Sequence, residues 1–218
     1  MYRREGIWLQ MFFDKIRYRQ HERCINGGKF ILLDFIVADG YDSYDLLAEE
    51  KLIEKGLYVI PINIAQFLTQ NDFAVRRMPL PQNTRGMLLA DKHNKILDTN
   101  SNKLVLVSND LDFKEYRFVA AHEYSHYIQD ENKNGQYDHS TLIVNEKLTE
   151  DKKVAEQKAN TLALCLLMPK KLLLDAWNKL DSNLYIEKKL EELARVFEVE
   201  LFHLMVRLGM MGLIEYGK

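Results

Sequence analysis

The chain has 218 residues, of which 47% are hydrophobic and 28% are charged, and its formal net charge is −2. This composition predicts a globular protein with a sizeable core, and it gives no electrostatic case for binding nucleic acid or an anionic membrane. The only two cysteines, Cys24 and Cys165, lie far apart, which excludes a disulfide framework and favours a reducing, cytoplasmic compartment.

Residues 1–28 differ from the rest of the chain, and no role is predicted for them. One face of a helix there would carry four apolar side chains, Trp8, Met11, Phe12 and Ile16. With the arginines nearby, such a helix can lie on a membrane or a partner. A terminal extension, docked or frayed, or a start codon placed too far upstream, is the favoured interpretation. No signal peptide and no membrane contact are expected.

The folded domain is expected to begin near residue 29 with an apolar run, followed by two helices. Asp42 or Ser43 is expected to cap a helix that runs to about Lys55. Its core face is expected to hold Leu46, Leu47 and Ile53. The second helix is predicted to start after its cap, Asn63, and to run to about Gln70.

Strand-like segments follow these helices. Three are predicted as strands, Phe73–Met78, Arg85–Asp91 and Lys103–Ser108, and a fourth, Lys95–Asp98, is expected to fold back as a hairpin. This short sheet leads directly into the next helix, and an edge strand of such a sheet can bind an extended peptide by main-chain pairing.

The most informative stretch is the His-Glu-x-x-His sequence at residues 122–126. No glycine or proline interrupts residues 115–129, so a helix is predicted, and His122 and His126 then share one face. Two imidazoles one turn apart can hold one Zn²⁺ ion. Glu123 follows the first histidine and can reach an activated water without itself being a ligand.

The segment Asp130–Lys153 is polar and long for a connection. It is interpreted either as a lid over the site or as a disordered surface loop, and the sequence does not decide between them. A helix is then predicted over Val154–Met168, ended by Pro169, and a further apolar segment covers Leu172–Leu180.

Two more helices are predicted from Ile186 to about Gly209. Their apolar positions are Leu190, Leu193, Ala194, Phe197, Val199, Leu201, Leu204, Met205 and Leu208. This spacing also occurs in helix-turn-helix proteins, so the alternative function is a non-catalytic regulator that acts by DNA or protein binding. The second helix offers only His203 and Arg207 as basic groups, and two helices packed on the core are therefore favoured.

These motifs resemble the ImmA/IrrE family of zinc metallopeptidases. The first is Arg117-Phe118-x-x-Ala121-His122-Glu123-x-x-His126, and the second is Glu156-x-x-Ala159-Asn160-x-x-Ala163 followed by Leu166-Leu167-Met168-Pro169. Leu162 and Ser125 replace the phenylalanine and the glycine that are frequent in the family, and only packing changes are expected from them.

The resemblance implies an α+β fold with a zincin-like core, in which a small sheet packs on the His-Glu-x-x-His helix and a helical region follows. The expected division is an N-terminal extension at 1–28, a metallopeptidase domain at 29–183 and a C-terminal helical hairpin at 184–218. The implied function is a zinc-dependent endopeptidase that cleaves a partner protein, expected to be a helix-turn-helix repressor of a mobile genetic element or stress regulon. A pseudo-peptidase that only binds its partner is a further alternative.

The expected metal ligands are His122, His126 and Glu156. No third histidine closely follows His126, so a later carboxylate is required, and Glu146 and Glu150 lie in the polar segment without periodicity. Asn160 is expected to accept a hydrogen bond from a ligating histidine. Glu123 is the expected general base. The oxyanion donor stays open among Tyr127, Tyr137 and His139. No role is predicted for His21, His93 or His203, and Cys165 is interpreted as a buried packing residue.

Overall fold

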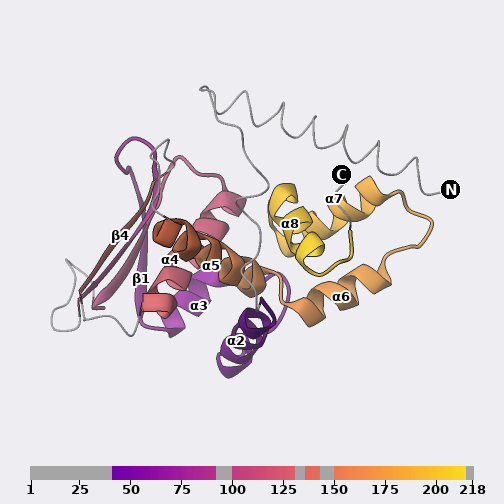
Figure 1. Cartoon of the computed structure of the whole chain (residues 1–218), viewed down its shortest axis with the longest axis horizontal. Coiled ribbons are helices and arrows are strands. Elements are labelled where there is room, and N and C mark those ends of the chain that lie inside the picture. The colour runs from indigo at the N-terminus through magenta and orange to yellow at the C-terminus, as the bar shows by residue number, and fades with distance from the viewer. Residues whose placement is uncertain (1–40, 92–99, 131–135, 143–149, 215–218) are drawn as a thin grey trace.

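The computed structural model describes residues 41–91, 100–130, 136–142 and 150–214, and for residues 130, 136–142 and 150 it describes the backbone only. Within these ranges seven helices and a four-stranded sheet form an α+β fold (Figure 1). The helices are α2 (Tyr41–Glu54), α3 (Ile64–Gln70), α4 (Phe113–Asp130), α5 (Glu150–Leu167), α6 (Lys170–Lys179), α7 (Ile186–Phe197) and α8 (Leu201–Met210). The strands are β1 (Phe73–Met78), β2 (Thr84–Asp91), β3 (Lys103–Ser108) and β4 (Gln136–Leu142).

The sheet has the strand order β1-β3-β2-β4. β1 is parallel to β3, whereas β2 is antiparallel to both β3 and β4. In Figure 1 the sheet forms one end of the molecule, helices α3, α4 and α5 lie on one side of it, and α6, α7 and α8 form the other end. The three strands predicted before α4 are confirmed, and the predicted strand Lys95–Asp98 lies outside the described residues.

The strand β4 contradicts the prediction of a lid or loop for the whole of Asp130–Lys153. Its backbone pairs with β2 from Thr84↔Leu142 to Asp91↔Gln136, and β4 is the outermost strand on this side among the described residues. Strand pairing uses main-chain groups, and an edge strand tolerates polar side chains because one side of it needs no partner strand. A polar segment therefore carried little signal for this strand in the sequence.

The helix α2 has a different buried face from the one predicted. Of the three predicted core residues, Leu47 is partly buried against the core, but Leu46 and Ile53 are 69% and 55% exposed. The buried residues of α2 are instead Asp45, Ala48 and Leu52. The reason is an ion pair between Asp45 and Arg207 of α8, which turns a charged residue toward the core. A prediction from apolar residues alone places Asp45 on the surface, and it therefore assigns the wrong face of α2 to the core.

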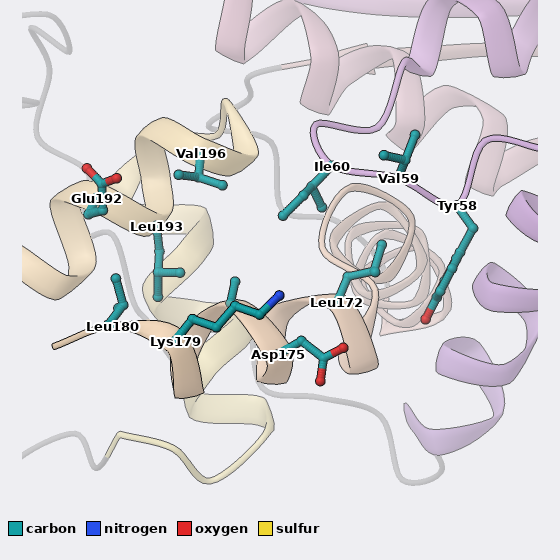
Figure 2. A pocket seen from close by; sticks show the side chains of 11 residues that line it. Tyr58, Val59, Ile60, Leu172, Asp175, Lys179, Leu180, Glu192, Leu193 and Val196 are labelled. Carbon is teal, nitrogen blue, oxygen red and sulfur yellow. The ribbon is translucent and has the colours of Figure 1, made fainter. Parts of the chain in front are cut away.

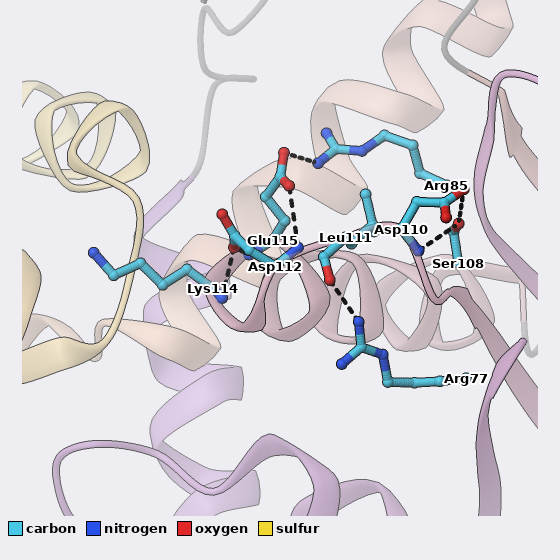
Figure 3. A network of polar contacts seen from close by, with 8 residues as sticks. All are labelled: Arg77, Arg85, Ser108, Asp110, Leu111, Asp112, Lys114 and Glu115. Carbon is cyan, nitrogen blue, oxygen red and sulfur yellow. Dashed lines mark hydrogen bonds and ion pairs between the residues drawn. The ribbon is translucent and has the colours of Figure 1, made fainter. Parts of the chain in front are cut away.

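Of the predicted helix caps, Asn63 is confirmed, whereas Asp42 and Ser43 lie inside α2 rather than at its start, and the cap of α4 was not predicted. The Asn63 side chain caps α3 by accepting a hydrogen bond from the Gln66 N–H at 3.0 Å. At α4 the Asp112 carboxylate accepts the backbone N–H groups of Lys114 at 3.0 Å and Glu115 at 2.9 Å, and the Glu115 carboxylate accepts the Asp112 N–H at 3.4 Å (Figure 3). This reciprocal capping box fixes the first turn of the helix that carries the His-Glu-x-x-His sequence.

The core lies between the sheet and the helices. Ala159 and Ala163 on α5 are both fully buried, and their small side chains allow α5 to approach α4 closely. Cys165 is also fully buried, and burial is the main cause that raises the pKa of its thiol to about 12, which confirms its interpretation as a packing residue. None of the described helices is long and apolar enough to cross a membrane.

Candidate metal centre and active site

Helix α4 presents two histidines on one face. The Nε2 atoms of His122 and His126 are 2.9 Å apart, and both side chains are buried. The opposite side of the helix is anchored by Tyr124, whose ring meets the rings of Phe67 and Phe73 edge-on at centroid distances of 5.0 and 5.6 Å. This packing holds the histidine pair in a fixed orientation.

Helix α5 supplies the third predicted ligand. The Glu156 carboxylate reaches both rings, with Oε2 at 3.2 Å from His122 Nε2 and Oε1 at 3.3 Å from His126 Nε2. Candidate ligand atoms of the three residues all lie within 4.8 Å of one another. The structure thus brings together, from two helices, the three residues that the sequence predicts as ligands.

The donor set fits a zinc ion. A tetrahedral site with bonds of about 2.0 Å places its ligand atoms about 3.3 Å apart, and the three separations here are 2.9, 3.2 and 3.3 Å. Two imidazole nitrogens and one carboxylate are also the ligand types of open catalytic zinc sites. Three protein ligands leave a fourth coordination position for a substrate or a solvent molecule.

The carboxylate of Glu123 lies against a glycine of the central strand β2. Glu123 is fully buried, and a Cβ atom added to Gly86 would lie 2.5 Å from its Oε1 and 3.1 Å from its Cδ. The same added atom would lie 2.5 Å from Cγ1 of Val119. Sequence reasoning missed Gly86, although a glycine inside a predicted strand is a signal of close approach.

Among the three candidate oxyanion donors, the structure describes the side chain of Tyr127 alone. The ring of Tyr127 meets Phe73 edge-on at 5.1 Å, and the Lys103 ammonium lies 5.3 Å from its centroid. Tyr137 and His139 are on β4, where only the backbone is described, and they pair in register with Ala90 and Leu88. The structure does not choose an oxyanion donor among these three residues.

The hydrogen bond predicted between Asn160 and a ligating histidine is not made to the ring of His122. Nδ1 of His122 is buried and has no hydrogen-bond partner within the described residues. The stabilising bond that ligating histidines generally make through their second nitrogen is therefore not supplied to His122 by Asn160.

Two basic residues near the centre were not predicted to have a role there. The ring of His203 on α8 stacks on Phe118 at 3.8 Å between centroids, and Phe118 lies 6.0 Å from the ring of His122. Burial is the main cause that lowers the pKa of His203 to about 3, and the charges of Arg85 and His122 add to it. His203 is therefore a neutral ring at neutral pH. Arg85 pairs with Glu115 at 2.7 Å (Figure 3).

A buried arginine joins the histidine helix to the C-terminal helices. The Arg117 guanidinium donates to the carbonyl oxygens of Phe197 at 2.8 Å, Glu198 at 2.7 Å and Ile62 at 2.7 Å. It also forms an ion pair with the Glu198 carboxylate at 3.1 Å. Three chain segments are thereby tied together one turn before His122.

A groove of about 400 Å³ lies away from these residues, between the segment Tyr58–Ile60 and helices α6 and α7 (Figure 2). Its walls are mostly apolar, with Asp175, Lys179 and Glu192 among the lining side chains. None of the three metal-ligand candidates lines it. The groove is therefore not part of the candidate metal centre.

Comparisons with known proteins agree with this geometry. The family model described as the IrrE N-terminal-like domain, Peptidase M78, matches residues 69–208, which include His122, Glu123, His126 and Glu156. A solved structure of a Mycobacterium tuberculosis transcriptional regulator is similar, with a TM-score of 0.52 and 18% sequence identity over 77% of this chain. The likeness shows the fold alone, and the match covers 46% of that regulator. A comparison with curated proteins gives no match.

Proposed function

Because the chain belongs to the IrrE N-terminal-like domain family, Peptidase M78, we propose that it is a zinc-dependent endopeptidase that hydrolyses a peptide bond in a partner protein. The observation that carries this proposal is the convergence of His122, His126 and Glu156 at mutual distances of 2.9 to 3.3 Å. Glu123 is the residue next to the first ligand on the same helix, where a general base is required.

The division of labour among the residues follows from their chemistry. The two histidines and Glu156 would hold a zinc ion, and the bound ion would supply a Lewis acid that acidifies water and polarises the scissile carbonyl. Glu123 accepts a proton from the attacking water and delivers it to the departing amine nitrogen. Its burial against β2 holds the carboxylate in one place and excludes bulk water from it.

The substrate is proposed to bind as an extended strand. β4 is the last strand in the order β1-β3-β2-β4, and it adjoins β2, the strand that contacts Glu123. An extended peptide can add to such an edge by main-chain hydrogen bonds. This mode selects an unfolded or extended segment of the partner, which suits cleavage of an exposed linker in a folded protein.

The partner class is proposed from the resemblance of the motifs. A helix-turn-helix repressor of a mobile genetic element or stress regulon is the expected substrate, and its cleavage would switch on transcription. The compartment is proposed to be the cytoplasm, which agrees with the buried free thiol of Cys165. The regulatory title of the similar mycobacterial protein belongs to that protein and is not carried over.

The test is cleavage of the repressor encoded beside the gene. Purified protein loaded with Zn²⁺ is incubated with the repressor, with and without chelator, and fragments are identified by mass spectrometry. We expect wild-type protein to cleave, and Glu123→Gln to keep the metal and the fold but lose cleavage, because an amide cannot act as the base. The control is His122→Ala/His126→Ala, which is expected to lose both metal and cleavage. Equal metal in this variant and wild type, or strong cleavage by Glu123→Gln, refutes the assignment.

A further inference from the structure

We propose that Gly86 and the β-bulge at Arg85 form a seat for the carboxylate of Glu123, so that the missing side chain at position 86 sets where the general base lies. This inference rests on the proposed function for its catalytic meaning. The contact itself is a property of the fold and can be tested without any substrate. Gly86 is accordingly a positioning residue, which acts through Glu123.

The space at Gly86 is the first observation. A Cβ atom there would come within 2.5 Å of both Glu123 Oε1 and Val119 Cγ1, closer than real Cβ contacts allow. The backbone of Gly86 does not require glycine, since its φ lies outside the positive range that favours this residue. The demand for glycine at this position therefore comes from the neighbouring side chains, and the catalytic carboxylate is one of the two nearest.

The position of Gly86 in the sheet is the second observation. It pairs with Val107 of β3 on one side and with Thr141 of β4 on the other. Val107 and Leu88 are fully buried in the core, so β2 is held from both sides. The strand has little freedom to retreat from α4. An added methyl group must then displace the Glu123 carboxylate and the Val119 side chain rather than the backbone.

The bulge is the third observation. Thr84 pairs with Leu142 and Gly86 with Thr141, so Arg85 is an extra residue of β2 opposite β4. Bulges bend a strand and redirect a side chain, and they are common beside active sites. Here the Arg85 guanidinium reaches Glu115 in the first turn of α4 at 2.7 Å. This ion pair joins the strand to the histidine helix next to the glycine contact, which fixes their relative position.

The consequence concerns the geometry of the base. General-base catalysis requires a carboxylate within hydrogen-bond reach of the proton it removes, and a displacement of about 1 Å can cost about 10²-fold in rate. The ligands His122 and His126 share a side of α4 with Val119 and Glu123, but the atoms nearest to a Cβ added at Gly86 belong to Val119 and Glu123 and not to either histidine. Gly86→Ala is therefore expected to impair proton transfer while the metal ligands stay in place.

The first arm of the test measures the coupling without substrate. Thermal unfolding midpoints are compared for Gly86→Ala in the wild-type background and in the Glu123→Ala background. We expect a fall of several degrees in the wild-type background and a clearly smaller fall once the Glu123 side chain is absent, because the clash with Glu123 is then relieved and only the clash with Val119 remains. Equal falls in both backgrounds overturn the proposed contact. Should Gly86→Ala alone fail to fold, a folded double variant supports the contact and an unfolded one overturns it.

The second arm measures metal and cleavage. Gly86→Ala is expected to bind Co²⁺ within a few-fold of wild type, with an unchanged visible spectrum, and to lose about 10²-fold in kcat for cleavage of the repressor with little change in KM. The matched control is Gly86→Ala/Val119→Ala, which relieves only the second clash and is expected to regain stability but not kcat. A restored kcat in that control, or a kcat near wild type in Gly86→Ala, refutes the proposal that Gly86 positions the Glu123 carboxylate. If wild-type protein does not cleave, the proposed function fails, and the thermal comparison alone decides the contact.

Discussion

The buried ion pair between Asp45 and Arg207 gives a prediction that also bears on function. Arg207 is fully buried on α8, where its Nη2 atom pairs with the Asp45 carboxylate of α2 and its Nε–H donates to the Met168 carbonyl at 3.0 Å. Nη1 has no hydrogen-bond partner in the described part of the chain. Asp45→Asn removes the negative charge with little change in shape and leaves the guanidinium charge buried without an opposite charge.

The expected loss follows from the cost of an uncompensated buried charge. Breaking a buried ion pair by removing one partner costs about 3–5 kcal/mol, and we expect Asp45→Asn to lower the free energy of unfolding by that amount. The double change Asp45→Leu/Arg207→Met replaces both charges by apolar groups and is expected to be neutral or stabilising. The matched control is Asp42→Asn on the same helix. Asp42 pairs with Lys170 at 3.0 Å, but the two side chains are 73% and 41% exposed, so its loss should cost less than about 1 kcal/mol.

The assay is urea unfolding at neutral pH followed by far-UV circular dichroism, with linear extrapolation to water. A loss below about 1 kcal/mol for Asp45→Asn, equal to that of the Asp42 control, would refute the buried pair. Such a result would also indicate that Arg207 is exposed, as the alternative function of DNA binding through α7 and α8 requires. A large loss for Asp45→Asn together with a stable double variant supports a core role for Arg207.

Three further predictions concern the metal centre, the thiol and a helix cap. Glu156→Ala should lower metal affinity strongly in a Zn²⁺ titration. Glu150→Ala should leave the affinity unchanged, because position 150 lies about 9 Å from position 156 along the axis of α5. A larger loss for Glu150→Ala would show that Glu156 is not the third ligand. Cys165 should stay unlabelled by a thiol reagent at neutral pH in a Cys24→Ser background until the protein is unfolded, since burial raises the pKa of its thiol to about 12; rapid labelling of the folded protein would contradict its burial. Asn63→Ala should lower the free energy of unfolding by about 1 kcal/mol, since it removes the side-chain acceptor of the Gln66 N–H; an unchanged urea midpoint would show that the cap contributes nothing.

The features predictable from the sequence are those written in neighbouring residues. His122 and His126 are one helical turn apart, and the Asn63 cap lies three residues from its donor. Helical periodicity also located the buried face of α7, at Leu190, Leu193, Ala194 and Phe197. In each case the signal and the structure lie on the same element, so a local pattern suffices.

The features that were missed depend on distant partners. Asp45 turns toward the core because of Arg207, 162 positions later in the chain, and no apolar period on α2 reveals that. β4 exists because its backbone pairs with β2, and backbone pairing is independent of the polar side chains that suggested a loop. The importance of Gly86 depends on Glu123, which lies on another element. Each of these is a tertiary contact that overrides a local preference.

The C-terminal helices show how tertiary contacts add to a sequence pattern that suits two functions. Leu193, Ala194 and Phe197 suit a helix-turn-helix protein and a packed helical hairpin equally well, so spacing alone leaves both open. The two basic residues that a recognition helix would use, His203 and Arg207, are both buried in the described structure. Phosphate and base contacts require such groups at the surface, and their burial removes them from that role. His203 instead stacks on Phe118, and Arg117 donates a hydrogen bond to the carbonyl oxygen of Phe197 at the end of α7. Phe118 and Arg117 lie four and five residues before His122 on α4. These helices thus contribute to the packing around the candidate metal centre, and this packing accounts for their apolar positions and for the burial of His203 and Arg207.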